Sequence, residues 1–141
     1  STECDEHTPH KVIYELRDLL GVDDLGGTMR LGSYPCNLET GTRTYDAYGR
    51  QEIAERHRHR YEFNREYESV LAAKGLVFSG RSPDGKFVEA IELPEHPWFL
   101  AVQFHPEFQS KPRSPHPLFD HFVKATYDHQ QSTKPASETM V

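Results

Sequence analysis

An apolar run from Trp98 to Phe104 places the strongest constraint on the fold. Its length suits one β-strand, and its nearly unbroken apolar character predicts a strand covered on both faces, as in the sheet of an α/β protein. Ligands of open α/β sheets bind beyond the carboxyl ends of the strands. The residues that directly follow this strand are therefore the first candidates for a functional site.

Those residues are His105, Pro106 and Glu107. In extended backbone, residues two apart point to the same side, so the side chains of His105 and Glu107 can approach each other. Pro106 fixes its own φ and biases His105 toward extended backbone. An imidazole oriented by a carboxylate can act as a general base toward a thiol or hydroxyl nucleophile. The alternative interpretation is a strand-end histidine beside a solvated glutamate.

A second candidate site is a string in which arginine and histidine alternate, from Arg56 to Glu62. A strand here would place its arginines on one face, and its histidines and Tyr61 on the other. Guanidinium groups suit paired hydrogen bonds to a carboxylate or phosphate, although a charged edge strand that resists aggregation is an open alternative. The arginines are Arg56, Arg58 and Arg60, and the histidines are His57 and His59.

Neither cysteine has the setting of a catalytic nucleophile. Cys4 lies among acidic residues and Cys36 follows a proline, whereas a nucleophile elbow requires small residues between a strand and a helix. The sequence therefore indicates a base and its orienting acid without the residue that they would activate. Two cysteines without zinc-motif spacing also favour a reducing, cytoplasmic setting.

The size and charge of the chain limit its function classes. A length of 141 residues suits one domain. The 16 Lys and Arg against 22 Asp and Glu give a net charge of −6, which argues against a nucleic-acid or membrane-surface partner. No apolar stretch approaches the roughly 18 residues that a membrane-spanning helix needs. The polar start at Ser1, without a methionine, suggests a fragment.

The other segments predict a mixture of helices and strands. A strand is expected over 25–32, and a hairpin over 76–93 with its turn at Pro83-Asp84-Gly85. The segment 11–20 fits a short helix, although Val12 to Tyr14 could equally begin a buried strand. The segment 33–50, rich in turn residues, predicts a long surface loop.

Helices are expected in two further places. One begins at the Asn64 cap, ends at Gly75, and carries Tyr67, Val70 and Leu71 on one face. The other is a final helix that buries apolar positions on one side. Residues 130–141 lack any apolar period and predict a disordered tail, which leaves 1–129 as the domain. The positions expected to be buried in the final helix are Phe119, Phe122, Val123 and Thr126.

Several strings of the chain are also found together in one known family. They are Leu25 to Gly32, Arg56 to Glu62, Gly80 to Ser82, His96 to Phe99, and Gln103 to Phe108. Together they resemble the carboxy-terminal part of the CTP synthase family, within its class I glutamine amidotransferase domain. The first two strings are specific to that family, whereas Gln-Phe-His-Pro-Glu is shared by many class I amidotransferases. The resemblance implies the carboxy-terminal half of a flavodoxin-like, three-layer α/β domain.

The resemblance also implies roles for particular residues. His105 and Glu107 match the histidine and glutamate of a Cys-His-Glu triad whose cysteine would lie upstream of Ser1. Glu3 matches a glutamate that contacts the substrate L-glutamine, and Arg60 matches an arginine that holds the same substrate. One acid and one arginine complement the α-amino group and α-carboxylate of glutamine. No metal ligand and no cofactor are expected in this piece.

The partners implied by the resemblance lie mostly outside the chain. An amino-terminal synthetase domain would bind UTP, ATP and magnesium and make CTP with ammonia from glutamine, in a cytoplasmic homo-tetramer. The piece alone is expected to be inactive. Two other functions stay open: a non-catalytic amidotransferase-like module that binds a ligand or partner, and a metal enzyme. The metal enzyme would use His57, His59 and His105, although the neighbouring guanidinium groups disfavour a divalent cation.

Overall fold

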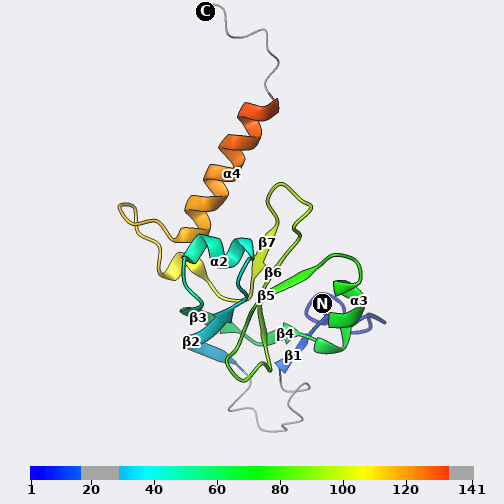
Figure 1. The fold of residues 1–141 in the computed structure, drawn as a ribbon. Helices are drawn as coiled ribbons and strands as arrows, with labels where there is room; N and C mark the ends of the chain where they lie inside the picture. Colours follow the sequence, from blue (N-terminus) through cyan, green and yellow to red (C-terminus); the bar gives the residue numbers. More distant parts are fainter. Residues whose placement is uncertain (17–28, 134–141) are drawn as a thin grey trace, which may run out of the picture.

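The computed structural model describes residues 1–16 and 29–133, which form two antiparallel sheets with helices beside them (Figure 1). The larger sheet has the strand order β3-β2-β5-β6-β7, and β1 pairs with β4 in a second sheet. This arrangement confirms a mixed α/β fold. The elements are β1 (Ile13–Glu15), β2 (Arg30–Leu38), α2 (Arg43–Tyr48), β3 (Glu52–His59), β4 (Tyr61–Phe63), η2 (Arg65–Tyr67), α3 (Glu68–Ala72), β5 (Val77–Arg81), β6 (Val88–Glu92), β7 (Leu100–Val102), η3 (Pro106–Phe108) and α4 (Pro117–Thr133).

The predicted surface loop over 33–50 is wrong, because these residues form most of β2 and all of α2. The signal for the strand is an alternation in which Cys36 and Leu38 turn inward and are buried. Pro35 is accommodated because β5 pairs with β2 only at Asn37 and Leu38. Among the described residues, no strand is hydrogen-bonded to Pro35 on the side of β2 that faces β5. The lack of an N–H group on the proline therefore costs no hydrogen bond there.

Helix α2 is held at its start by a carboxylate from the sheet. The backbone N–H groups of Arg43 and Thr44 donate to the two oxygens of Glu92, at 3.0 and 3.1 Å. The helix closes at Gly49, whose φ of 65° is readily adopted by glycine. The hydrogen bonds to Glu92 place α2 on the core face of the sheet. The buried core residues there are Cys36, Leu38, Ile53, Phe104 and Leu118.

Strand β3 alternates as predicted, with Arg56 and Arg58 exposed and His57 buried. It starts earlier than expected, at Glu52. In the second sheet, Glu15 of β1 faces Tyr61 of β4. Of the two interpretations of the segment 11–20, the strand is therefore correct at Ile13–Glu15 and the helix is wrong there, while 17–20 lies outside the described residues. Residues 25–28 of the strand expected over 25–32 also lie outside them.

The Asn64 cap and the hairpin are confirmed. The Asn64 side chain accepts a hydrogen bond from the Glu66 N–H at 3.1 Å, and the helical segment that it opens ends before Gly75. Strands β5 and β6 pair antiparallel around the predicted turn. The apolar side of this helical segment is not a core face, since Val70 is exposed.

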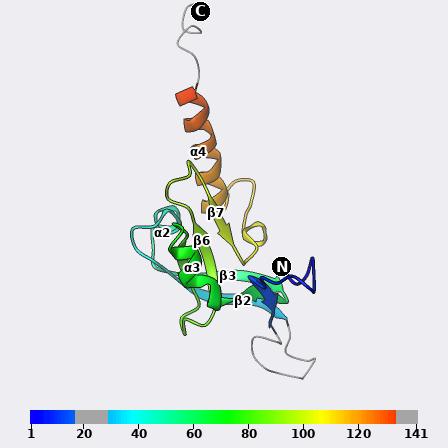
Figure 2. The same cartoon turned by 90° about the vertical axis from the view of Figure 1, so that its right-hand side faces the viewer.

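Two expectations for the last third of the chain need correction. Strand β7 is an edge strand of half-buried and exposed residues, whereas β6 is the strand buried on both faces. Helix α4 projects from the body of the molecule (Figures 1 and 2). Its predicted apolar face is exposed. The exposed fraction is 53% for Phe122 and 65% for Val123, and Phe119 and Thr126 are exposed too, so only Leu118 of this helix is buried.

Helix α4 also continues past the predicted start of the disordered tail at 130, because it ends at Thr133. Residues 134–141 of that tail lie outside the described residues. None of the helices that the structure describes is long and apolar enough to cross a lipid bilayer.

Candidate active site

The side chains of His105 and Glu107 contact each other in the segment that follows β7, which ends at Val102. His105 keeps an extended backbone (φ −112°, ψ 90°), and Pro106 then opens the short 3₁₀ helix η3. This turn brings Glu107 Oε1 to 2.7 Å from His105 Nδ1. The contact thus forms through a helical turn rather than through continued extended backbone. Because the carboxylate can only accept, Nδ1 carries the proton, and a neutral imidazole leaves Nε2 able to take one.

The charge of the Glu107 carboxylate is stabilised locally. Its own backbone N–H and, secondly, the hydrogen bond from His105 lower the pKa of Glu107 below its ordinary value. It is therefore ionised at neutral pH. The exposed fractions of the His105 and Glu107 side chains are 38% and 54%, so both can be reached by another molecule or another part of a protein.

The sheet and the following loop hold this pair in place. The His105 N–H donates to the Arg56 carbonyl at 2.8 Å, and the Phe108 ring lies 5.2 Å from the His105 ring. Beside them is an open hollow lined partly by Arg56, Arg58 and Phe108. Two residues that contact His105, Arg56 and Phe108, therefore line a hollow that has both guanidinium and apolar groups.

A buried carboxylate anchors the loop that follows the pair. Gln109 donates to Glu55 Oε2 at 2.6 Å, and Tyr48 donates to Glu55 Oε1 at 2.8 Å. His116 Nδ1 accepts from the Leu118 N–H, so its Nε2 carries the proton that it donates to Glu55 at 2.8 Å. The loop between Gln109 and His116 is thus tied to β3 at both ends.

The two histidines of β3 form a hydrogen-bonded pair. His57 Nδ1 lies 2.8 Å from His59 Nε2, and His59 Nδ1 lies 3.0 Å from the Tyr61 carbonyl oxygen. Burial and then the nearby Arg30 guanidinium lower the pKa of His57 to about 3 and that of His59 to about 4. Both rings are therefore neutral at pH 7. Within residues 1–16 and 29–133, no group of three His, Cys, Asp or Glu side chains is arranged to hold a metal ion.

A buried charge network lies behind these histidines. Arg30 donates to Glu62 at 3.0 Å and to Glu89 at 2.7 Å, and all three residues are buried. Burial raises the pKa of Glu62 to about 7, against the opposing effect of Arg30. This network was not predicted from the sequence. The one hint in the sequence is that Arg30 and Cys36 are an even number of residues apart in one strand. Their side chains therefore point to the same face of the sheet, which predicts an inward side chain for Arg30.

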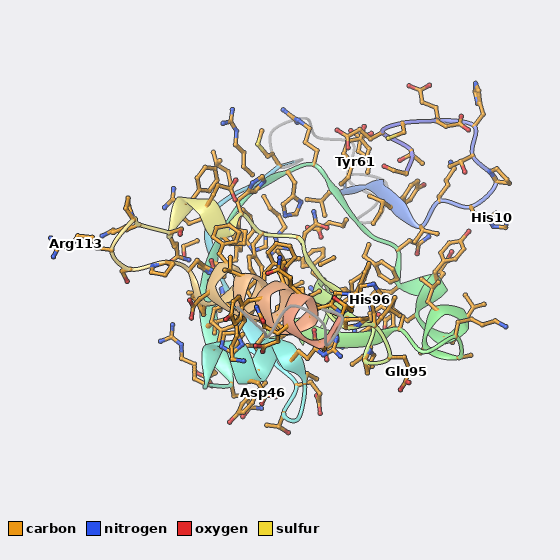
Figure 3. The ribbon with its side chains drawn as sticks, turned by 90° about the horizontal axis from the view of Figure 1, so that it is seen from above. His10, Asp46, Tyr61, Glu95, His96 and Arg113 are labelled. Carbon is orange, nitrogen blue, oxygen red and sulfur yellow. The ribbon has the colours of Figure 1, made fainter. Side chains whose placement is uncertain are left out.

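The two predicted substrate-binding residues lie outside the strands, in segments that are hydrogen-bonded to the second sheet or lead into it. Glu3 lies in an exposed turn that the Thr2 N–H ties to Ile13 of β1. Arg60 is exposed between β3 and β4, and its carbonyl accepts from the Leu16 N–H at 2.8 Å. Figure 3 shows Tyr61, the next residue, beside the amino-terminal turn. That Glu3, Arg60 and His105 contact the same substrate molecule stays a prediction.

The described cysteines differ in accessibility. Cys36 is completely buried, and this burial raises the pKa of its thiol to about 12, so it stays protonated at neutral pH. Cys4 is exposed in the amino-terminal turn. The structure thus gives Cys36 no nucleophilic character, in agreement with the sequence analysis.

Comparison with known proteins identifies similar sequences over most of this chain. Residues 14–125 match the glutamine amidotransferase class-I family. The chain is 58% identical to a CTP synthase of Acidobacterium capsulatum over 143 residues, which cover 99% of this chain and 26% of that protein. It is 59% identical to a CTP synthase of Koribacter versatilis over 132 residues, covering 92% of this chain and 24% of that protein.

A solved structure shares the fold. The glutaminase domain of the Trypanosoma brucei CTPS with bound acivicin superimposes with a TM-score of 0.81 at 34% identity, covering 91% of this chain and 50% of that one. The chain spans about a quarter of the length of the curated relatives named above.

Proposed function

The chain belongs to the class I glutamine amidotransferase family, and we propose that it is the carboxy-terminal part of the glutaminase domain of a CTP synthase. The whole protein would be cytoplasmic and tetrameric, and would make CTP from UTP with ammonia taken from L-glutamine. ATP and magnesium would bind in a synthetase domain outside this chain, so they need no residue described above. The His105–Glu107 hydrogen bond of 2.7 Å is the observation that carries the glutaminase assignment.

In the proposed reaction, His105 moves the protons. Glu107 holds the Nδ1 proton, so His105 Nε2 can take the proton of a cysteine thiol supplied from outside this chain. The thiolate forms a bond to the side-chain carbonyl carbon of glutamine. The C–N bond then breaks, the imidazolium returns its proton to the nitrogen, and ammonia leaves. Water hydrolyses the remaining thioester to glutamate, with His105 again accepting and returning a proton.

Glu3 and Arg60 would bind the substrate rather than react with it. The Glu3 carboxylate complements the α-amino group of glutamine, and the Arg60 guanidinium can donate two parallel hydrogen bonds to its α-carboxylate. The exposure of both residues supports this part of the proposal. A site of this kind selects a free amino acid, because a glutamine inside a peptide lacks both charges and a glutamine at either end of a peptide lacks one of them.

The decisive experiment is His105→Ala in the full-length protein. We expect glutamine-dependent CTP formation to fall by at least about 100-fold, since general base catalysis of this kind contributes that much or more. Formation from added ammonia should stay normal. His129→Ala, at an exposed position on α4, is the matched control and should leave both activities unchanged.

Two results would contradict the proposal. Equal loss of the glutamine-dependent and ammonia-dependent activities would remove His105 from the glutaminase. Glutamine binding by the unaltered protein without hydrolysis would favour a non-catalytic binding module.

A further inference from the structure

Two hydrogen bonds from different parts of the chain converge on one backbone oxygen. The Tyr61 carbonyl accepts from His59 Nδ1 at 3.0 Å and from Gln103 Nε2 at 3.2 Å. A carbonyl oxygen has two lone pairs, so both bonds can form together. Tyr61 directly follows Arg60, and Gln103 comes two residues before His105. The oxygen therefore links the proposed substrate-binding segment to the proposed catalytic segment.

The histidine donor is fixed by its surroundings. A carbonyl can only accept, so His59 Nδ1 carries the proton and, in the neutral ring, His59 Nε2 is an acceptor. His57 Nδ1 faces that nitrogen at 2.8 Å and must be the donor. His57 is almost fully buried, so the pair has little freedom to turn. The bond to Tyr61 therefore comes from an anchored side chain.

The backbone around both segments is held as well. The Arg60 carbonyl accepts from the Leu16 N–H at 2.8 Å. On the other segment, the His105 N–H donates to the Arg56 carbonyl at 2.8 Å, and the Gln103 N–H donates to the Glu89 carbonyl at 2.9 Å. The hydrogen bond from the Gln103 side chain to the Tyr61 carbonyl differs from these backbone bonds. It connects the His105 segment to the peptide next to Arg60.

We propose that Gln103 is a positioning residue for glutamine, acting through the Tyr61 carbonyl on Arg60, with His59 as the second donor. This inference rests on the proposed function. A bound glutamine would reach from Arg60 at its α-carboxylate to the reacting carbonyl beside His105. Its reactive geometry thus depends on the distance between these two segments, and a misplacement of about 1 Å can cost a large part of the rate. Gln103 fixes that distance without contacting the substrate.

The test is Gln103→Met in the full-length protein, alone and combined with Arg60→Ala. Methionine keeps the length of the side chain and removes the donor, while His59 still satisfies the Tyr61 oxygen. We expect kcat/KM for glutamine to fall about 5-fold, within the range of one neutral hydrogen bond. Ammonia-dependent CTP formation should not change. In the Arg60→Ala background, Gln103→Met should have no further effect, because its action passes through Arg60.

Controls separate this inference from the proposed function. Gln51→Ala, at an exposed position just before β3, should leave kcat/KM for glutamine unchanged. An equal fall caused by Gln103→Met with and without Arg60 would overturn the inference, since it would show a structural effect. A loss in Arg60→Ala with none in Gln103→Met would overturn the inference alone. Normal kcat/KM in Arg60→Ala would overturn both the inference and the proposed substrate site.

Discussion

Ionisable residues inside this molecule make its stability depend on pH in two opposite directions. The pKa of Glu62 rises from its ordinary 4.5 to about 7, chiefly through burial. Its stabilising contribution is therefore present below pH 4.5 and is lost as the pH rises through 7. The pKa values of His57 and His59 fall from 6.5 to about 3 and about 4. Their contribution is present above pH 6.5 and is lost as the pH falls through 4 and 3.

The variant Glu62→Gln isolates the first of these effects. It removes the titrating group but keeps its shape, so the free energy of unfolding of the variant should rise relative to the wild type between pH 4.5 and pH 8. The upper limit of this change is about 3 kcal/mol, from the pKa shift of Glu62. Urea unfolding of the complete glutaminase domain at several pH values measures it. A difference in the free energy of unfolding that does not change with pH would contradict this assignment.

Close packing between strands determines where β5 can lie. Gly80 of β5 faces Ala90 of β6 and pairs with Leu38 of β2. A Cβ atom at Gly80 would lie 3.0 Å from Ala90 Cβ, 3.1 Å from Cys36 Sγ and 3.2 Å from Leu38 Cδ2. These neighbours are buried core atoms with little room to move. Glycine at this position therefore allows three strands to meet over the core.

We expect Gly80→Ala to destabilise the domain by about 1–3 kcal/mol, the usual cost of adding a group to a filled core. Adding Ala90→Gly should restore part of that loss, because it removes the closest of the three contacts. Chemical unfolding of the single and double variants measures both effects. A single variant as stable as the wild type would show that the strands separate freely here.

The molecule as a whole leaves apolar surface open at one end. Strand β7 is at the edge of its sheet, and α4 projects from the body of the molecule (Figure 2). This helix exposes Phe122, Val123 and Tyr127 along its length. The chain covers only half of the glutaminase domain whose fold it shares. Alone, the described residues have an unpaired strand edge, which favours association.

We therefore expect the 141-residue chain, produced by itself, to aggregate or to unfold without a cooperative transition. Light scattering and urea unfolding followed by circular dichroism test this at several protein concentrations. The complete glutaminase domain serves as the control and should unfold cooperatively. A reversible, concentration-independent, cooperative transition of the short chain would contradict the expectation.

Features that depend on neighbouring residues could be predicted from the sequence. The Asn64 cap, the hairpin around Asp84 and the alternation of β3 all follow local rules, since a few adjacent residues provide every group involved. The contact between His105 and Glu107 was also expected, although a turn rather than extended backbone forms it.

Other features were decided only by the tertiary structure. Pro35 can lie in β2 because β5 pairs with that strand only at Asn37 and Leu38. Arg30 can be buried because two strands that are distant in the sequence bring Glu62 and Glu89 to its guanidinium group. The exposure of Phe122 and the edge position of β7 depend likewise on what packs beside them. Sequence periodicity shows which side of an element is apolar. It does not show whether another element covers that side, because burial is a property of the assembled fold.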